Sequence, residues 1–451
     1  MTGATAGVAA TPLKEHREQV ARAGLAVERR ANGDAAVCES GGRLRVAAVN
    51  YHDIFGGAAR AAFRLCEGLR RSGVDLTLHV QAKTSDAFWA RRSGGRARLR
   101  SMVDVIPLYR YRRRTGSYWS LNWLPNPSFP SFSGTDIVHL HFVGSGYLPI
   151  SRFRRLEAPI VWTLHDMWAF TGGCHYDEFC GRYVEGCGKC PQLGSRSARD
   201  LSSYLYRRKT DSWRNLPLTV VSPSRWLADE ARRSAVFREH RIEVIPNGID
   251  LELYRPVNKA WAREILRLPP DGKLVMFGAL SSTSDTRKGF AHLQGALDRL
   301  RSAQRAQPVS LVIFGAREPQ RPPDLGFPVH YMGHVSDDIT LALLYSASDV
   351  MVVPSVQENL SNVIVESMAC GTPVVAFDIG GNRDMIEHQA GGYLAQPYAA
   401  EDLAAGIEWV LADDERLRRL SMNARRKCED DFEISKVAAR YISLYGSLLK
   451  R

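Results

Sequence analysis

The sequence has no apolar run long enough to cross a bilayer. Its longest apolar runs, Lys273–Leu280 and Asp349–Val353, have the length of a buried strand, whereas a membrane-spanning helix needs about 20 apolar residues. The first residues, Met1–Glu15, also lack the charged and then apolar pattern of a signal peptide. We therefore expect a cytoplasmic protein without a membrane-spanning segment.

Two common phosphate-binding signatures are absent as well. The 451 residues contain no Gly-x4-Gly-Lys-Ser/Thr loop, and no Gly-x-Gly-x-x-Gly follows the first expected strand. These absences argue against a P-loop kinase and against a dinucleotide-dependent dehydrogenase. The length suits two or three domains, each with room for a sizeable core.

Positive charge is in excess, and the excess is concentrated. The net charge of +12 comes from 60 Lys and Arg against 48 Asp and Glu. A basic, aromatic surface suits an anionic membrane face or a lipid-linked acceptor, and a solvated basic loop is the plain alternative. Nucleic acid is disfavoured because no nucleic-acid-binding motif accompanies the charge. The basic stretch holds Arg91, Arg92, Arg96, Arg98, Arg100, Arg110, Arg112, Arg113 and Arg114, with Trp89, Tyr109, Tyr111 and Trp119 among or beside them.

Strand-length apolar runs alternate with helical patterns along most of the chain. Residues 1–42 have no clean apolar period, and we expect a mostly disordered leader with a short helix near residues 12–30. From Arg43 on, the alternation predicts parallel sheets covered by helices on both faces. The expected strands are Arg43–Asn50, Asp75–Val80, Asp136–His141, Pro159–Leu164, Leu218–Ser222, Ile242–Pro246, Lys273–Gly278, Val309–Phe314, Pro328–Met332, Asp349–Val353 and Pro373–Phe377.

The alternation divides into two α/β units. We expect one doubly wound domain over residues 43–250 and a second over residues 251–430, with a hinge near Pro246-Asn247-Gly248 and Pro256. A final amphipathic helix within residues 431–451 can pack on either domain. In open α/β sheets the ligand binds beyond the carboxyl ends of the strands, so the loops that follow the strands are where chemistry is expected.

Two glutamates flank an expected helix start in the segment Pro354–Val375. Glu358 follows a buried strand, Ser361 is a good N-cap, and Glu366 lies between one and two turns into the helix. A helix N-terminus favours a diphosphate, and carboxylates accept hydrogen bonds from vicinal hydroxyls. The pattern therefore fits a nucleotide sugar, and two ordinary surface acids are the alternative.

This segment resembles the Glu-x7-Glu motif of the family-4 retaining glycosyltransferases, the glycogen-synthase-like group with the GT-B fold. Glu358 and Glu366 stand at the separation of that motif, and the flanking Pro354-Ser355 and Gly371-Thr372-Pro373-Val374-Val375 also match. The resemblance spans roughly residues 43–430. It implies two facing Rossmann-like domains with a cleft between them and a nucleoside-diphosphate sugar as donor.

The resemblance also assigns roles within the motif. It implies that Glu358 contacts the donor sugar and that Glu366 contacts the ribose. The backbone between them meets the diphosphate and the sugar, which carries over to Asn359 and Leu360.

A pair of cations follows the first strand of the second domain. Arg287-Lys288-Gly289 opens a helix, and cations there suit a leaving diphosphate, which gains negative charge as the glycosidic bond breaks. Ordinary surface cations are the alternative. The family has an Arg and a Lys at this place, but the Arg that it usually has just after the strand is replaced by Gly278-Ala279-Leu280. We expect Arg287 to substitute for it.

The first domain contributes two further loops. Gly56-Gly57 follows the first strand, and although Gly-Gly alone predicts no more than a tight turn, the resemblance places this loop beside the donor phosphate and the acceptor. Thr163-Leu164-His165-Asp166 ends another strand. A histidine there is usually structural, but the resemblance places His165 near the donor sugar, with Asp166 as its support or as an acceptor contact.

Four of the eight cysteines lie in an insertion at residues 172–194. Four thiolates can bind zinc tetrahedrally, and in a reducing cytoplasm a metal is favoured over two disulfides; free or redox-active thiols are the third interpretation. A similar insertion occurs in a subset of bacterial exopolysaccharide glycosyltransferases, so it is expected to shape the acceptor side of the cleft. The cysteines are Cys174, Cys180, Cys187 and Cys190.

We therefore expect a hexosyltransferase that uses a nucleoside-diphosphate sugar and a saccharide or lipid-linked acceptor in cell-surface polysaccharide synthesis. We also expect transfer with retention and no metal requirement for catalysis. The expected partners include an anionic membrane, contacted peripherally, and no nucleic acid. A homologue that binds the donor in a regulatory or scaffolding role is the alternative, supported only by the missing Arg. The expected catalytic residues are Glu358, Lys288, Arg287 and His165.

Overall fold

We describe the protein from a computed structural model. The structure describes residues 43–93, 97–115, 118–126, 129, 132–278, 283–301 and 308–450, with the backbone alone at residues 97 and 98. The expected leader at residues 1–42 and the Ala279-Leu280 step lie outside the described residues.

The first domain is built on a seven-stranded sheet in which every pairing is parallel, in the order β3-β2-β1-β4-β5-β6-β7. The chain order reverses between β1 and β4, which pair from Val46 and Ile137 onward. Strands such as β5 are buried along their whole length because helices cover both faces. The strands are β1 (Arg45–His52), β2 (Asp75–Ala82), β3 (Ala90–Arg92), β4 (Ile137–Leu140), β5 (Ile160–Thr163), β6 (Leu218–Ser222) and β7 (Arg241–Val244).

Helices of this domain include several short 3-10 turns. Two of the α-helices begin with capping side chains: Asp200 accepts from the backbone N–H groups of Ser202 and Ser203, and Ser224 accepts from Leu227. The helical elements are α2 (Gly57–Arg71), α3 (Ala97–Asp104), η1 (Ile106–Arg110), η2 (Ile150–Arg155), η3 (Trp168–Phe170), η4 (Arg182–Val184), α4 (Leu201–Trp213) and α5 (Arg225–Arg233).

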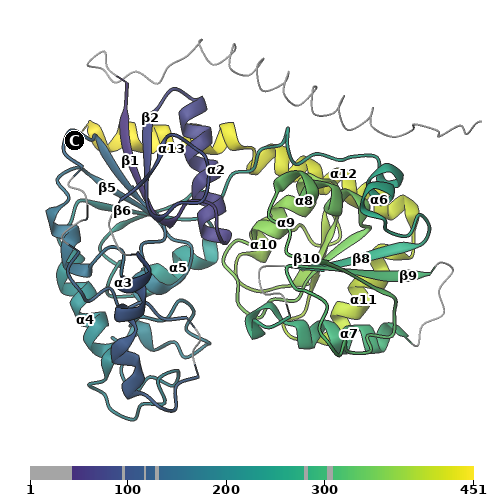
Figure 1. Cartoon of the computed structure of the whole chain (residues 1–451), viewed down its shortest axis with the longest axis horizontal. Coiled ribbons are helices and arrows are strands. Elements are labelled where there is room, and N and C mark those ends of the chain that lie inside the picture. The colour runs from purple at the N-terminus through teal and green to yellow at the C-terminus, as the bar shows by residue number, and fades with distance from the viewer. Residues whose placement is uncertain are drawn as a thin grey trace, which may run out of the picture.

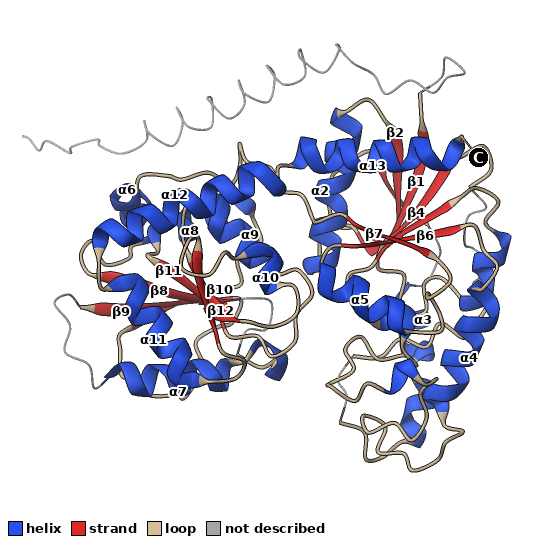
Figure 2. Cartoon of the chain, turned by 180° about the vertical axis from the view of Figure 1, so that it is seen from behind, coloured by secondary structure: helices blue, strands red, loops and turns tan. Residues whose placement is uncertain are grey.

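The second domain has a six-stranded sheet that is also parallel, in the order β10-β9-β8-β11-β12-β13. Its chain order reverses between β8 and β11, the counterpart of the β1–β4 step. Figures 1 and 2 show the two domains side by side, each with helices on both faces of its sheet. The strands are β8 (Lys273–Gly278), β9 (Val309–Phe314), β10 (Val329–Gly333), β11 (Val350–Val353), β12 (Val374–Phe377) and β13 (Gly392–Ala395).

The last helix returns to the first domain. In Figure 1, α12 runs along the second domain and α13 continues across the first. Tyr441 and Tyr445 of α13 are buried there and bond to Thr163 (2.9 Å) and to His139 (2.7 Å). The helical elements are α6 (Lys259–Leu266), η5 (Thr286–Lys288), α7 (Phe290–Arg301), α8 (Asp338–Ala347), α9 (Asn362–Ala369), α10 (Asn382–Met385), α11 (Ala400–Leu411), α12 (Asp414–Asp431) and α13 (Ile434–Leu449).

Two parallel, doubly wound sheets confirm the expected fold class. Each of the eleven expected strands is present within a few residues of its expected bounds. The short edge strands β3 and β13 were not expected. In the part of the chain that the structure describes, no helix combines the length and the apolar character that a bilayer crossing requires.

Candidate functional site

The loop after β11 carries Glu358 and is held by the loop after β12. Gly380 and Gly381 pack against its backbone so closely that a Cβ on either would overlap the carbonyl oxygen of Glu358 or of Asn359. Gly380 also has a φ of +50°, which favours glycine. The sequence analysis missed this pair, although it follows a strand end just as Gly56-Gly57 does. The backbone at Glu358 is thus held by the loop after β12, which also donates from the Gly381 N–H to the Glu358 carbonyl at 3.3 Å.

Glu358 is buried, with an exposed fraction of 6%, and faces two cations. The Nζ atom of Lys288 donates to Oε2 at 2.7 Å, and Nη1 of Arg287 donates to the same oxygen at 3.3 Å. Burial alone would raise the pKa of this carboxyl, but Lys288 and Arg287 lower it to about 2. Glu358 is therefore ionised at neutral pH.

Lys288 and Arg287 lie on the short turn η5, just beyond the carboxyl end of β8. Asp285 starts this turn by accepting from the backbone N–H of Arg287 at 3.0 Å. The guanidinium of Arg287 lies 4.6 Å from the centroid of the Tyr176 ring, which comes from the first domain. Both expected cations are thus brought to Glu358, as the sequence predicts for a shared site.

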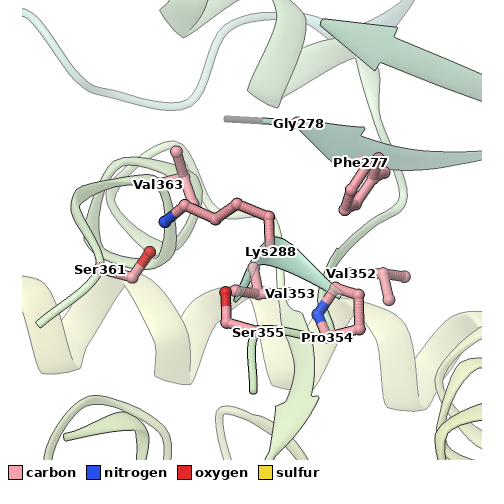
Figure 3. Close-up of a pocket in the computed structure, with 9 residues that line it drawn as sticks. All are labelled: Phe277, Gly278, Lys288, Val352, Val353, Pro354, Ser355, Ser361 and Val363. Atoms are coloured by element: carbon pink, nitrogen blue, oxygen red, sulfur yellow. The ribbon is translucent and has the colours of Figure 1, made fainter. Parts of the chain in front are cut away.

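A small pocket lined by Lys288 lies at the carboxyl ends of β8 and β11. In Figure 3 the Lys288 side chain extends across it toward Ser361 and Val363 at the start of α9. Ser361 occupies the expected N-cap position, but its hydroxyl makes no capping hydrogen bond. The amide groups that open α9 therefore lack a side-chain cap, and such a helix start can bind an anion.

Glu366 lies deeper than Glu358 and is bound by the first domain. Its Oε1 accepts from Arg64 of α2 at 2.7 Å, and its Oε2 accepts from Tyr345 at 2.8 Å. Burial would raise the pKa of this carboxyl, whereas Arg64 and Arg60 lower it. The expected ribose contact stays a prediction, and a ribose would have to share Glu366 with Arg64 or displace it.

The Gly56-Gly57 turn touches the start of α9 from the opposite domain. Gly56 has a φ of +91°, and a Cβ there would meet nothing within 4 Å, so the backbone angle rather than lack of space calls for glycine. The carbonyl of Gly57 accepts from Nδ2 of Asn362, the first residue of α9, at 2.9 Å. Two loops that the sequence placed at one site are therefore in contact.

His165 lies on the first-domain side of this contact. Its Nε2 lies 3.2 Å from Nδ1 of His141, so one ring donates to the other. Burial lowers the pKa of His165 to about 4, an effect that Asp166 opposes. His165 is therefore neutral at pH 7, and the contact with His141 engages one of its two ring nitrogens, Nε2.

Asn359 connects the two domains through its side chain. Its Oδ1 accepts from the Ser224 hydroxyl at 2.6 Å, and its Nδ2 donates to the carbonyls of Leu164 (3.4 Å) and His165 (3.3 Å). Leu360, in contrast, is buried in the core of the second domain. The expected contact of these two residues with a diphosphate runs through their backbone and stays a prediction.

Asp166 is occupied by neighbours in its own loop. One carboxylate oxygen lies 2.8 Å from Nδ1 of His175, and the other accepts from the backbone N–H of Trp168 at 2.8 Å. The pKa of Asp166 is lowered although burial would raise it, with His175 as the main opposing cause. Asp166 therefore orients the start of the Cys-rich insertion, and a contact with donor or acceptor stays a prediction.

The Cys-rich insertion reaches the second domain directly. Gln357 donates to Asp177 at 2.8 Å, and the Tyr176 hydroxyl lies 3.5 Å from Oε1 of Glu358. Burial and the nearby Glu358 raise the pKa of Tyr176, so its hydroxyl remains a donor. Tyr176 and Asp177 were not predicted from the sequence. Their position directly after His175 in the insertion could have indicated that they lie near the site.

The four clustered cysteines surround a second small pocket within the insertion. Burial raises the pKa of each thiol, to about 12 for Cys187 and about 11 for Cys190, and the seven cysteines that the structure describes are all free thiols. Within the described residues, no group of three or more His, Cys, Asp and Glu side chains converges in an arrangement that holds a metal ion. The disulfide interpretation is not realised here, and zinc stays a prediction. The cluster is Cys174, Cys180, Cys187 and Cys190.

Two family models match the chain. The model described as Glycosyltransferase Family 4 matches residues 55–253, and the one described as Glycosyl transferases group 1 matches residues 271–413. Together they cover about three quarters of the sequence, the first on the first domain and the second on the second.

Curated relatives are similar over much of their length. A D-inositol 3-phosphate glycosyltransferase of Thermobispora bispora is 28% identical over 333 residues, which cover 70% of this chain and 71% of the relative. An MMP alpha-(1->4)-mannosyltransferase of Mycolicibacterium hassiacum is 30% identical over 242 residues, covering 52% of this chain and 54% of the relative.

Solved structures share the arrangement of both domains. Sucrose-phosphate synthase from Thermosynechococcus elongatus superposes with a TM-score of 0.63 at 23% identity and covers 90% of this chain and 100% of its own. Anabaena HepE in complex with UDP-glucose gives a TM-score of 0.59 at 17% identity, again covering 90% and 100%. At this level of identity the likeness establishes the fold, which is the expected GT-B fold.

Proposed function

Because the chain belongs to the group 1, family 4 glycosyltransferases, we propose that it transfers a hexose from a nucleoside-diphosphate sugar to a hydroxyl of a saccharide acceptor, with retention at the anomeric carbon. The observation that carries this proposal is the position of Glu358. Its carboxylate is ionised, buried and held by Lys288 and Arg287 where the two domains meet.

The diphosphate of the donor is assigned to the pocket beside Lys288. There it meets Lys288 and the amide groups at the start of α9, with Arg287 next to Lys288 on the same turn. Negative charge grows on the diphosphate as the glycosidic bond breaks, and charged donors that are already in place stabilise it without reorganising. Glu358 serves this purpose by fixing both cations before the donor arrives, while its free lone pairs accept from sugar hydroxyls.

His165 is assigned to the donor sugar as a neutral hydrogen-bonding group. Its low pKa excludes a role as a fixed positive charge at neutral pH. Since His141 occupies Nε2, the contact with the sugar is assigned to Nδ1. The acceptor hydroxyl attacks from the face that the diphosphate leaves, which gives retention, and no protein nucleophile is assigned.

The chemistry of relatives guides the choice of substrates. HepE was solved with UDP-glucose. One curated relative is named a D-inositol 3-phosphate glycosyltransferase, and the other is named a mannosyltransferase. We assign a nucleoside-diphosphate hexose as donor and a saccharide, including a lipid-linked one, as acceptor, in the assembly of a cell-surface polysaccharide. A lipid-linked acceptor would bring the protein to the face of a membrane. No metal is needed for catalysis in this scheme, because side-chain cations supply the positive charge.

Two measurements test the proposal. A thermal-shift panel of nucleoside-diphosphate sugars is expected to show one donor that stabilises the protein selectively, since a ligand that binds only the folded state raises its melting temperature. That donor, radiolabelled, is then offered with saccharide acceptors, and the anomeric configuration of the product is read from its NMR coupling constant. An inverted product would refute retention, and stabilisation without transfer to any acceptor would favour the regulatory alternative.

A further inference from the structure

The first domain exposes an apolar stripe along α3 and η1. Leu99 and Met102 of α3 are 51% and 62% exposed, and Ile106 and Tyr109 of η1 are 53% and 73% exposed. Within each element the two side chains are three residues apart, the spacing of neighbours on one helix face, and the two elements are separated only by Val105. Eight of the fifteen large exposed apolar side chains among the described residues fall between residues 54 and 118. Apolar exposure is thus concentrated on this part of the molecule.

The opposite side of α3 is fixed to the domain. The Ser101 hydroxyl bonds to the Tyr51 hydroxyl at the end of β1 (2.7 Å), and the buried carboxylate of Asp104 accepts from the backbone N–H groups of Leu121 (2.9 Å) and Asn122 (2.7 Å). Figures 1 and 2 both show α3 next to the point where the strands of the first sheet converge. The stripe is therefore presented to solvent by a firmly held element.

The sequence around the stripe is rich in positive charge. Between Ala87 and Thr135 the sequence has nine arginines and a single carboxylate, Asp104, which is 1% exposed. The guanidinium carbon of Arg114 lies 5.9 Å from the centroid of the Tyr109 ring, which places this charge beside the stripe. Six of the arginines are exposed in the structure: Arg91, Arg92, Arg110, Arg112, Arg113 and Arg114.

We propose that this surface docks the protein on an anionic lipid bilayer. The four apolar side chains enter the boundary between headgroups and acyl chains, and the arginines bind lipid phosphates. The aliphatic members of the stripe decide between this partner and a nucleic acid: Leu99, Met102 and Ile106 gain free energy by leaving water for a bilayer, whereas a phosphate backbone offers them nothing.

The docking surface lies near the proposed donor site. The link between docking and sugar transfer rests on the proposed transferase function. Tyr51, which anchors α3, lies near the end of β1, and the Gly56-Gly57 turn of the donor site follows the same strand. Phe55, which precedes that turn, is 58% exposed. A lipid-linked acceptor in the docked leaflet would therefore reach the cleft from this side.

Co-sedimentation of the full chain with vesicles tests the docking without any assay of activity. Binding is expected to vesicles of phosphatidylcholine and phosphatidylglycerol, weakly or not at all to phosphatidylcholine alone, and to weaken with salt. Each arginine near the lipid strengthens binding roughly fivefold, the equivalent of about 1 kcal/mol, so loss of four lowers the affinity by more than a hundredfold. The basic variant carries Arg110→Gln, Arg112→Gln, Arg113→Gln and Arg114→Gln.

Two further variants make the test specific. A control with four exposed arginines replaced on the second domain is expected to bind vesicles almost as wild type does. An apolar variant that keeps every arginine is expected to lose at least tenfold in affinity. The control is Arg317→Gln, Arg321→Gln, Arg418→Gln and Arg419→Gln, and the apolar variant is Leu99→Ser, Met102→Ser, Ile106→Ser and Tyr109→Ser.

Three outcomes would overturn the proposal. Equal loss in the control would mean that net charge alone drives binding. Undiminished binding by the apolar variant would remove the stripe from the interface. Loss of self-association by the apolar variant in light scattering, with vesicle binding unchanged, would assign the stripe to a second copy of the chain.

Discussion

Glu358 keeps its charge in a buried position because two cations face it. Burial of the carboxylate costs desolvation free energy, and this cost is offset only while Lys288 and Arg287 stay within hydrogen-bonding distance. The sequence analysis found all three residues because they lie in short motifs with recognisable spacing. Tyr176 and Arg64 were not predictable in this way, since they lie 182 and 302 positions from the glutamates that they contact.

Tyr176 is expected to act mainly through its ring. Tyr176→Phe keeps the ring over Arg287 and removes only a 3.5 Å hydroxyl contact, so kcat/KM for the donor should fall by less than about tenfold. Tyr176→Ala also removes the cation–π contact, which is worth about 0.5–2 kcal/mol, and should lose more in steady-state kinetics. Equal losses in the two variants would show that the hydroxyl, not the ring, is what matters.

The ion pair between Arg64 and Glu366 is expected to stabilise the contact between the domains. Arg64→Met leaves a buried carboxylate without its partner, which typically costs about 3–5 kcal/mol. The free energy of unfolding from urea titration should show this loss, and the double variant with Glu366→Gln should recover part of it. A change below about 0.5 kcal/mol in Arg64→Met, the size expected of ordinary surface substitutions, would contradict the buried pairing.

Among the elements, those with strong patterns were predictable and the weakly patterned ones were not. Buried runs such as Val350–Val353 are continuous and apolar, and each expected strand of this kind is present. The edge strands β3 and β13 have three and four residues and no such run. The sequence did not predict which domain α13 packs on, because an apolar helix face can pack on either core.

The Cys-rich insertion is the element whose chemistry is most open to test. If zinc binds the four clustered thiols, the site carries two net negative charges, one of which the buried Lys209 would offset. Elemental analysis of protein purified without chelator should then find about one zinc per chain. The variant with Cys187→Ser and Cys190→Ser should lose it, while Cys428→Ser, remote from the cluster, should keep it. Metal-free wild-type protein would refute the zinc assignment.

The two-domain architecture of the whole molecule could be predicted, but the way the domains meet could not. Loops that follow β1 and β5 in the first domain contact the loop after β11 and the start of α9 in the second. Motifs identify such loops one at a time. Contacts such as those of Asn359 with Ser224 and His165 depend on the relative placement of complete domains, which no local pattern encodes.

Buried histidines predict how the stability of the whole molecule depends on pH. Burial lowers the pKa of His139 to about 3 and that of His165 to about 4, and that of His141 also falls well below its usual value. Unfolded histidine binds a proton near pH 6.5, so protons favour the unfolded chain below that pH. The free energy of unfolding should be highest above pH 6.5. It should fall between pH 6.5 and about 4 by roughly 1.4 kcal/mol per pH unit for each histidine that stays neutral.

Urea unfolding at several pH values between 7.5 and 5 measures this slope. A His139→Gln variant removes one of the three groups, and its slope should be smaller than that of the wild type. A wild-type stability that does not change over this range would show that the histidines are not held neutral.

The central claim is that Lys288 and Glu358 act on the donor, and steady-state transfer by substituted proteins tests it most directly. Lys259→Ala is a matched control. Lys259 bonds to Asp349 at 2.7 Å, the distance between Lys288 and Glu358, and an arginine, Arg263, stays bonded to Asp349 when the lysine is removed. Asp349 also accepts from the backbone of Leu274, near the amino end of β8, away from the proposed site.

Lys288→Ala and Glu358→Ala should each raise the barrier to transfer by at least about 3 kcal/mol, a loss of more than a hundredfold in kcat. Lys259→Ala should transfer sugar at nearly the wild-type rate. Near-normal turnover in both site variants, or an equal loss in the control, would contradict the account.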